Sequence, residues 1–269
     1  MADEKQNSPP NTESAAAFEK FLVPTIFGPW SQALINHAAT NSGEKVLDIG
    51  CGTGAAARYA AEIVGENGQV AAIDINAGMI EFARNLVTDF SIDWRLADAS
   101  TLPFGDRSFN LVAGNQVLQF LPDKTKALSE TKRVLLKDGR IALSVYCAIE
   151  LCPAHCAVAR ALEKYKVDPS GILNPYSFND PMILGDIIQD AGFRDVSVVR
   201  KTMESRFPSA ENFVQSLAPG GPSARHALEQ LNKSELEMVI AEVTKTLANY
   251  VEQKNLRVIT TSHFALGRG

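Results

Sequence analysis

Three glycines and two carboxylates near the first apolar runs of the chain could hold a nucleotide-like ligand. Asp48 lies in the first run, and Gly50, Gly52 and Gly54 follow it at spacings of two residues. Glycine tolerates a positive φ and lets a ligand approach the main chain without meeting a Cβ atom. Asp74 ends the next apolar run, twenty residues after Gly54. A parallel βαβ unit places an acid there to bind ribose hydroxyls.

The elements that must position these residues alternate along the chain. Apolar runs predict strands, and apolar residues at helical spacing predict helices between them. Because strands alternate with helices, we predict an α/β fold with a parallel, doubly wound sheet and right-handed crossovers. The predicted strands span residues 46–49, 69–74, 92–97, 109–114, 139–146, 196–201 and 256–266, and the predicted helices between them include 55–64, 77–86, 123–136 and 182–192.

The N-terminal part of the chain precedes this alternation. Residues 1–14 are polar and predict a disordered tail, followed by a single domain of residues 15–269. Residues 15–44 carry apolar positions at helical spacing, interrupted at Pro24. They therefore predict two short helices packed against the main body.

Two later segments interrupt the alternation. Residues 147–181 are punctuated by prolines between short helical pieces, and residues 203–257 carry helical patterns at 209–217 and 233–252. We interpret both segments as helical insertions in the α/β domain. Residues 219–222, which read Pro-Gly-Gly-Pro, predict a flexible link in the second one.

The composition excludes several classes of function. Hydrophobic residues make up 45% of the 269 residues, enough for a sizeable core. The formal net charge is −5 and the basic residues are dispersed, which argues against a nucleic-acid partner. No apolar run approaches the ~18 to 20 residues of a membrane span, and the N-terminus does not resemble a signal peptide. Four cysteines suggest no disulfide framework, so we expect a cytoplasmic protein in a reducing compartment.

The turn, the acid and the order of elements resemble the class I S-adenosylmethionine-dependent methyltransferases, and within them the branch related to ubiquinone and menaquinone C-methyltransferases. In that family the first strand ends in Asp-x-Gly-x-Gly-x-Gly, which residues 48–54 match. Dinucleotide dehydrogenases have Gly-x-Gly-x-x-Gly instead, which aims helix N–H groups at a pyrophosphate that S-adenosylmethionine lacks. The resemblance covers residues 45–146. It implies a Rossmann-like, seven-stranded, mostly parallel sheet with an antiparallel last strand, and a lid formed by residues 15–44 and the two insertions.

The resemblance also implies which residues hold the adenosine part of S-adenosylmethionine. Asp74 would accept hydrogen bonds from both ribose hydroxyls, while Ile75 and Met79 would pack on the adenine face. Asp98 would bind the exocyclic amine, and the Ala99 N–H would face the ring. For two of these residues, a structural role is the alternative to adenine binding. Met79 would then pack in a helix core, and Asp98 would cap a helix or form a turn.

The methionine part would lie across the glycine turn, where the Asn115 carbonyl and Gly50 would contact its amino group. Asn115 follows the fourth predicted strand, and open α/β sheets bind ligands at the carboxyl ends of their strands. The whole predicted cofactor site consists of Trp30, Asp48, Gly50, Cys51, Gly52, Gly54, Asp74, Ile75, Met79, Asp98, Ala99, Asn115 and Gln116.

The candidates for a group that acts on the methyl acceptor are His155, Gln119 and Tyr146. Methyl transfer is an in-line displacement at a sulfonium, so the protein mainly aligns the nucleophile and excludes water, and a base is optional. His155 could deprotonate a phenol, enol or amine, because its unperturbed pKa lies near neutral pH. A structural histidine is the alternative. His263, in the last predicted strand, is interpreted as a wall residue.

A cluster of cysteines raises the question of a metal. Cys147, Cys152, His155 and Cys156 gather in one segment, but their spacing matches none of the paired-cysteine zinc patterns. Their apolar neighbours favour a buried helix. We therefore predict no metal site.

These features together predict an enzyme that transfers a methyl group from S-adenosylmethionine to a carbon, oxygen or nitrogen atom of a small, partly apolar metabolite. A first alternative keeps the cofactor but catalyses a non-methylating cyclisation, with the sulfonium acting only as a positive charge. A second alternative, a nicotinamide oxidoreductase, is disfavoured by the glycine spacing. The sequence leaves open whether the chain forms a homodimer.

Overall fold

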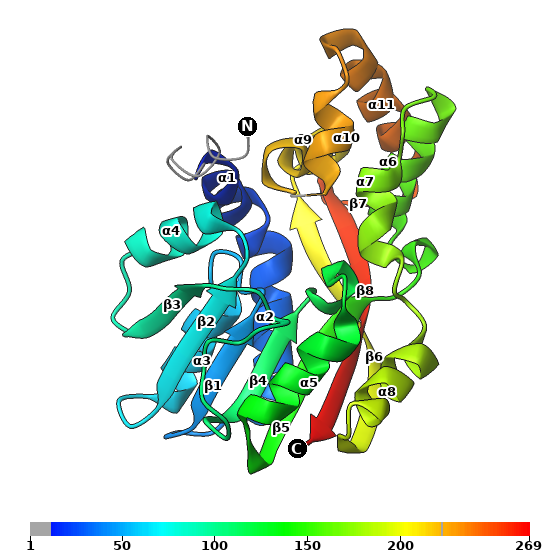
Figure 1. The fold of residues 1–269 in the computed structure, drawn as a ribbon. Coiled ribbons are helices and arrows are strands. Elements are labelled where there is room, and N and C mark those ends of the chain that lie inside the picture. The colour runs from blue at the N-terminus through cyan, green and yellow to red at the C-terminus, as the bar shows by residue number, and fades with distance from the viewer. Residues whose placement is uncertain (1–11, 222) are drawn as a thin grey trace, which may run out of the picture.

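An eight-stranded sheet runs through the residues that the computed structural model describes, which are 12–221 and 223–269 (Figure 1). The strand order is β3-β2-β1-β4-β5-β8-β6, and β7 pairs with β8 off this path. The strands are β1 (Lys45–Ile49), β2 (Gln69–Asp74), β3 (Ile92–Leu96), β4 (Phe109–Asn115), β5 (Leu135–Tyr146), β6 (Arg194–Phe207), β7 (Val251–Glu252) and β8 (Asn255–Arg268).

The predicted sheet topology is confirmed. Strands β3, β2, β1, β4 and β5 pair in parallel, and β8 inserts between β5 and β6 in antiparallel pairing with both. The order reverses after β1, because β2 and β4 both pair with it. This switch point leaves room for a ligand at the carboxyl ends of the central strands. The two-residue β7 is an additional strand that the sequence did not indicate.

Helices complete the layers on the two faces of the sheet. They are α1 (Glu13–Phe21), η1 (Val23–Phe27), α2 (Gly28–His37), α3 (Ala55–Val64), α4 (Ala77–Asn85), η2 (Leu118–Phe120), α5 (Lys124–Val134), η3 (Ile149–Leu151), α6 (Pro153–Lys164), α7 (Ser170–Leu173), η4 (Asn174–Tyr176), α8 (Pro181–Asp190), α9 (Ala210–Gly220), α10 (Ala224–Glu229), α11 (Lys233–Thr246) and η5 (Ala248–Tyr250). Here η1 is a single π-helical turn and the other η elements are 3₁₀ turns.

Alternate residues of each central strand belong to two separate cores. In β1, Val46 packs with the core that includes α2 and α3, whereas Leu47 packs with the core that includes α5 and α8. In β4, Leu111 and Val112 divide in the same way. Because both faces are covered, the central strands are apolar throughout, which explains why the sequence shows continuous apolar runs there.

The predicted helices and strands of the central part agree closely with the structure, but the two ends differ. Residues 1–11 of the expected tail lie outside the described residues, and Glu13 and Ser14 are already helical in α1. Of the flexible link expected at 219–222, residues 219–220 instead belong to α9, and Pro222 lies outside the described residues. The helix expected at 233–252 ends at Thr246.

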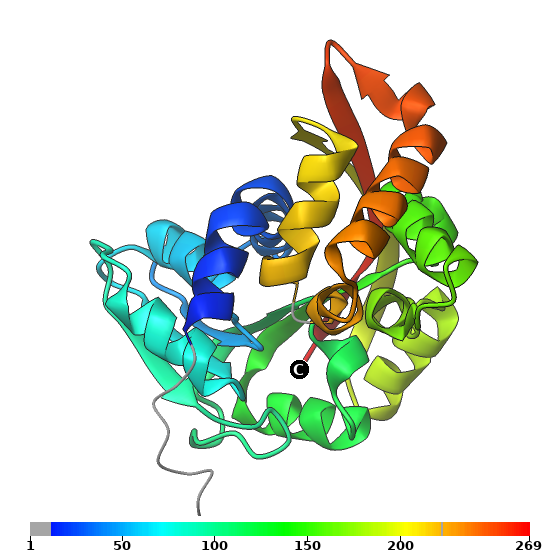
Figure 2. The ribbon, with the colours of Figure 1, turned by 90° about the horizontal axis from the view of Figure 1, so that it is seen from above.

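The largest difference concerns the segment 203–257, for which only helices were expected. Strand β6 continues to Phe207, and β8 begins at Asn255, so a long β6–β8 hairpin extends into that segment. Helices α9, α10 and α11 lie at the far end of this hairpin (Figure 1). Seen from above, α1 lies beside α9 (Figure 2), and the two helices pack together. We call α6, α7, η4 and α9–α11 the cap, which covers the carboxyl edge of the sheet.

Candidate active site

The glycine turn after β1 lies at the carboxyl edge of the sheet. Gly50, Gly52 and Gly54 have φ angles of 63°, 54° and 91°. A Cβ atom on Gly50 would lie 2.3 Å from Val117, and one on Gly54 would lie 2.1 Å from the ring of Trp94. The glycines are therefore needed for their left-handed backbone, and two of them also make room for neighbouring side chains of the protein. The sequence did not reveal this second requirement.

Two carboxylates flank the turn. Asp48 is 1% exposed, and its Oδ2 accepts a hydrogen bond from the Ala57 N–H at 3.0 Å, in the first turn of α3. Burial, together with the nearby charge of Asp74, raises the pKa of Asp48 to about 7. Asp74, at the end of β2, accepts from the N–H groups of Gly52 and Asn76, both at 2.8 Å. Burial also raises the pKa of Asp74.

The residues expected around adenine come together at the ends of β2 and β3. Ile75 is 73% exposed although it is apolar, so it offers a surface for a planar ring. Met79 is buried in the core through α4, and Ala99 is also buried. Asp98 is exposed and accepts from the Ser100 N–H at 2.7 Å, which lowers the pKa of its carboxyl. Asp98 thus forms the turn that the structural alternative described.

A chain of side-chain hydrogen bonds organises the carboxyl end of β4. Ser144, on the neighbouring β5, donates from Oγ to Asn115 Oδ1 at 2.6 Å, and Asn115 Nδ2 donates to Ser31 at 3.1 Å. Gln116 has a positive φ of 58°, and its N–H donates to Ser144 Oγ at 3.0 Å. A non-glycine residue in this region stores strain, which is typical of functional sites.

The amide of Gln116 extends this chain toward the acceptor candidates. Gln116 Nε2 donates to Ser262 Oγ at 2.9 Å, and Gln116 Oε1 accepts from Gln119 Nε2 at 3.1 Å. Gln119 is only 7% exposed, and its Oε1 has no partner among the described residues. A buried amide oxygen without a donor costs free energy, so a ligand with an O–H or N–H group would stabilise it.

The N-terminal helix α1 covers the glycine turn. Glu19 Oε2 accepts from Thr53 Oγ1 at 2.5 Å, and Glu19 Oε1 pairs with Arg58 at 2.7 Å. Arg58 also donates to the Thr53 carbonyl at 2.5 Å. The Phe18 ring lies 3.7 Å from the place of a Cβ atom on Gly52. Glu19, Thr53 and Arg58 were not among the predicted site residues, because no local spacing connects α1 with the turn.

Two predicted cofactor residues, Trp30 and Cys51, are buried in the protein. Trp30 is 1% exposed, donates from its indole to Thr260 Oγ1 at 2.9 Å and meets the Phe264 ring edge-on. Trp30 of α2 therefore packs against β8. Because Ser262 of β8 pairs with Tyr146, the last residue of β5, Thr260 lies at the carboxyl edge of the sheet. Cys51 lies in the turn, and burial raises the pKa of its thiol.

The other acceptor candidates, His155 of the cap and Tyr146 at the end of β5, belong to one aromatic cluster. The His155 ring lies 5.9 Å from that of Tyr176 and 5.1 Å from that of Phe213, and Tyr176 lies 4.7 Å from Tyr146. Burial lowers the pKa of His155 to about 4, so its imidazole is neutral at pH 7. Its Nδ1 has no partner in the described part of the chain. Burial raises the pKa of Tyr146, which keeps the phenol protonated.

The structure brings η2 and η4 into contact, so Gln119 and Tyr176 belong to the same region. His263 instead contacts the Asn179 carbonyl through Nε2 at 3.0 Å.

Within residues 12–221 and 223–269, no group of three or more His, Cys, Asp or Glu side chains could hold a metal ion. No helix in the same ranges is long and apolar enough to cross a membrane.

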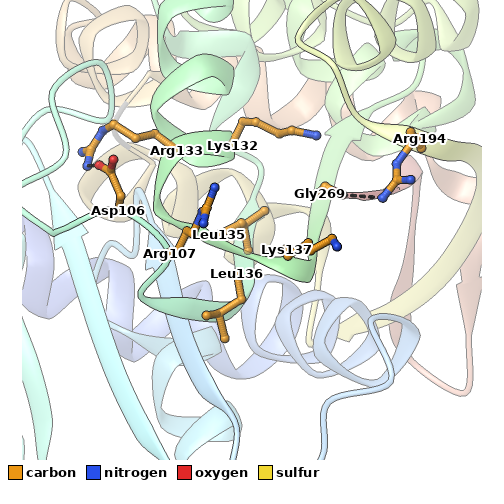
Figure 3. Close-up of a pocket in the computed structure, with 9 residues that line it drawn as sticks. All are labelled: Asp106, Arg107, Lys132, Arg133, Leu135, Leu136, Lys137, Arg194 and Gly269. Carbon is orange, nitrogen blue, oxygen red and sulfur yellow. Dashed lines mark hydrogen bonds and ion pairs between the residues drawn. The ribbon is translucent and has the colours of Figure 1, made fainter.

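A pocket at the opposite, amino edge of the sheet has a different character. Figure 3 shows its lining from the end of α5, the start of β5 and the start of β6. It encloses about 340 Å³, and basic side chains dominate it, including Arg107, Lys132 and Lys137. Arg133 is neutralised there by Asp106 and Glu130. Because this pocket is on the other edge, it does not belong to the site at the glycine turn.

Comparisons with known proteins agree with this geometry. Residues 47–143 match the family model described as a methyltransferase domain. The chain is 41% identical over 135 residues to aklanonic acid methyltransferase DauC of Streptomyces sp. (strain C5), a match that covers 49% of this chain and 61% of that relative. It is 34% identical over 168 residues to the ubiquinone/menaquinone biosynthesis C-methyltransferase UbiE of Haemophilus ducreyi, covering 60% of this chain and 59% of that relative. The matches thus span about three fifths of the length of these curated relatives.

A solved structure shares the fold. Phosphoethanolamine N-methyltransferase 2 of Haemonchus contortus, in complex with S-adenosyl-L-methionine, superposes with a TM-score of 0.61 at 20% identity. The match covers 94% of this chain and 56% of that one.

Proposed function

We propose that this chain, whose residues 47–143 form a methyltransferase domain, transfers a methyl group from S-adenosylmethionine to a small, partly apolar metabolite. The observation that carries the proposal is the glycine turn at the carboxyl edge, with Asp74 hydrogen-bonded to Gly52 beside it. This is the place where an open α/β sheet binds a nucleoside.

The charges around the turn support a cationic, phosphate-free ligand. Asp48, Asp74 and Asp98 supply carboxyl groups at this edge, whereas the guanidinium of Arg58 is already paired with Glu19. A sulfonium and an ammonium group would be attracted there, and a pyrophosphate would be repelled. The same charges disfavour a nicotinamide dinucleotide.

The residues of the site would divide the work of holding the methyl donor. Asp74 would bind the ribose hydroxyls, and the exposed side chain of Ile75 would support the adenine ring beside Met79 and Asp98. Asn115, oriented by Ser144 and Ser31, would receive the amino group. When bound, S-adenosylmethionine supplies a methyl group already activated by its positive sulfur.

Residues of the cap, of η2 and of the end of β5 would orient the acceptor and exclude water. The aromatic cluster of Tyr146, Tyr176 and Phe213 gives an apolar wall, and Gln119 Oε1 would accept a hydrogen bond from the substrate. Neutral His155 could accept a hydrogen bond from a substrate O–H or N–H group at Nδ1, and its lowered pKa makes it a weak base. An apolar wall with few polar anchors suits a small organic substrate.

Calorimetry with the purified chain tests the first step. We expect binding of S-adenosylmethionine and of S-adenosylhomocysteine, with a loss of at least tenfold in affinity for Asp74→Asn. The exposed Asp89→Asn, which changes the same charge away from the turn, should bind like the wild type. Binding of neither ligand by the wild-type chain would refute the proposal.

A screen with methyl-labelled donor and a metabolite extract tests the transfer itself. We expect label in small molecules and one S-adenosylhomocysteine released for each product. Product formed without release of S-adenosylhomocysteine would instead support the cyclisation that the sequence left as an alternative.

A further inference from the structure

We propose that Glu19 latches α1 over the glycine turn, and that this latch sets how fast the nucleoside ligand leaves the site. The inference rests on the proposed function for the identity of that ligand. It assigns a positioning role to a residue of the N-terminal lid that lies outside the methyltransferase-domain match at 47–143.

The latch is a three-membered contact between α1, the turn and α3. The Glu19 carboxylate uses one oxygen for the Thr53 hydroxyl and the other for the Arg58 guanidinium, at 2.5 and 2.7 Å. Arg58 returns to the turn by donating to the Thr53 carbonyl. Thr53 is fully buried, and the side chains of Arg58 and Glu19 are only 19% and 23% exposed. A pair shielded in this way is screened less by salt than a surface pair.

The position of the latch places it between the ligand and solvent. Thr53 lies between Gly52 and Gly54, so the groups that Glu19 holds belong to the turn itself. Phe18, one residue before Glu19, covers Gly52. A ligand that contacts the turn must therefore pass α1 when it enters or leaves. Lids of this kind control product release in many enzymes.

Helix α1 also joins the turn to the cap. It packs against α9 of the cap on one side and against α4 on the other, as Figure 2 shows from above. Helix α9 carries Phe213, which meets the ring of His155. Opening α1 would thus loosen both the cofactor turn and the aromatic wall. Helix α1 would therefore act as a lid for both the methyl donor and the acceptor.

Removal of the negative charge should unlock the lid without removing a ligand contact. For Glu19→Gln we expect S-adenosylhomocysteine to dissociate about tenfold faster, measured by surface plasmon resonance, with an association rate changed less than twofold. The control is Glu62→Gln, an exposed glutamate of α3 with no side-chain partner within the described ranges, which should behave like the wild type.

A second variant separates the ion pair from other effects of residue 19. Arg58→Met removes the other half of the pair, and combining it with Glu19→Gln should add little to either single change. Independent, multiplicative effects of the two substitutions would overturn the latch. An unchanged dissociation rate combined with slower association would also overturn it, because Glu19 would then only shape the entrance.

Hydrogen exchange tests the latch without any ligand. In the free protein we expect amides of residues 13–21 to exchange about tenfold faster in Glu19→Gln than in the wild type or in Glu62→Gln. Equal exchange in all three proteins would overturn the latch. If the wild type binds no S-adenosylhomocysteine, the proposed function fails, and the exchange experiment still decides whether Glu19 holds α1.

Discussion

At the scale of single residues, the glycines of the turn meet two separate demands. Gly54 combines a φ of 91° with the Trp94 ring, which would lie 2.1 Å from an added Cβ atom. Gly43 also has a positive φ, 81°, but an added Cβ atom would meet nothing within 4 Å. Substitutions at Gly43 and Gly54 can therefore separate the cost of backbone strain from the cost of steric conflict.

We expect Gly43→Ala to lower the free energy of unfolding by about 1 kcal/mol through backbone strain alone. Gly54→Ala should lower it by roughly 2 to 4 kcal/mol, because the indole must also move. Urea unfolding measures both values. Equal losses for the two variants would show that Trp94 yields without cost and that only the conformation matters.

The buried carboxyl of Asp48 predicts an unusual pH dependence of stability. Its pKa is about 7 in the folded chain and about 3.9 in an unfolded one. The folded state therefore keeps a proton that the unfolded state releases, so this stabilisation is present at low pH and is lost as the pH rises through 7. Between about pH 4 and 7 the loss amounts to about 1.4 kcal/mol per pH unit.

Asp48→Asn removes this contribution. Its amide oxygen can still accept from the Ala57 N–H, so we expect the variant to gain stability relative to the wild type as the pH rises from 4 to 7. Urea unfolding at several pH values gives the difference between the two proteins, in which the other titrating groups cancel. A difference that stays constant with pH would mean that Asp48 ionises normally in the fold.

Local sequence patterns were sufficient for the turn but not for its lid. Asp48, the three glycines and Asp74 are separated by short, fixed spacings that reflect one strand-turn-helix-strand unit. Glu19 meets Thr53 and Arg58 across 34 and 39 residues. No periodicity encodes such a contact, because it depends on how α1 packs on the finished sheet.

At the scale of elements, the end of β4 is oriented by its neighbour β5. Ser144 is fully buried and contacts both Asn115 Oδ1 and the Gln116 N–H through one hydroxyl. Without this hydroxyl, the Asn115 side chain would lose its fixed orientation. Ser144 thereby also fixes the end of β4, whose Asn115 carbonyl is the proposed contact of the amino group of the methyl donor.

For Ser144→Ala we expect a roughly tenfold loss of affinity for S-adenosylhomocysteine in calorimetry, with about 1 kcal/mol lost from the free energy of unfolding. Ser216→Ala serves as the control. Ser216 is also buried, but its hydroxyl donates to the Phe213 carbonyl within α9. We expect Ser216→Ala to lose a similar free energy of unfolding and to keep the affinity for S-adenosylhomocysteine. An equal loss of affinity in both variants would remove the special role of Ser144.

Strands with both faces buried were predictable, and the outer half of β6, with one exposed face, was not. The central strands are continuous apolar runs, so their positions follow from the sequence. Beyond residue 201, β6 is mostly exposed on one face and includes charged residues such as Glu204 and Arg206. Its strand conformation there comes from pairing with β8, which lies some fifty residues later. The sequence around 203–207 carries no apolar alternation strong enough to indicate this.

At the scale of the whole molecule, one hydrophobic core connects the lid, the sheet and the cap. Phe18 and Leu22 of the N-terminal segment, Val46 of β1, and Phe213 and Val243 of the cap belong to the same buried cluster. The antiparallel β8 runs from the sheet into the cap and carries buried side chains at both ends. A continuous core should make the cap and the sheet unfold together.

The two tryptophans report on different parts of this core. Trp30 lies between α2 and β8, whereas Trp94 lies on β3 against the glycine turn. Trp30→Phe leaves Trp94 as the single tryptophan, and Trp94→Phe leaves Trp30. We expect each variant to show one urea transition in which its fluorescence and its far-ultraviolet circular dichroism coincide. Because the two signals are compared within one variant, the stability lost with the Trp30–Thr260 hydrogen bond does not affect the comparison.

A fluorescence transition of Trp30 clearly separated from the circular dichroism transition would show that the lid and cap fold apart from the sheet. The shared lid over both ligands would then need a cause other than the common core.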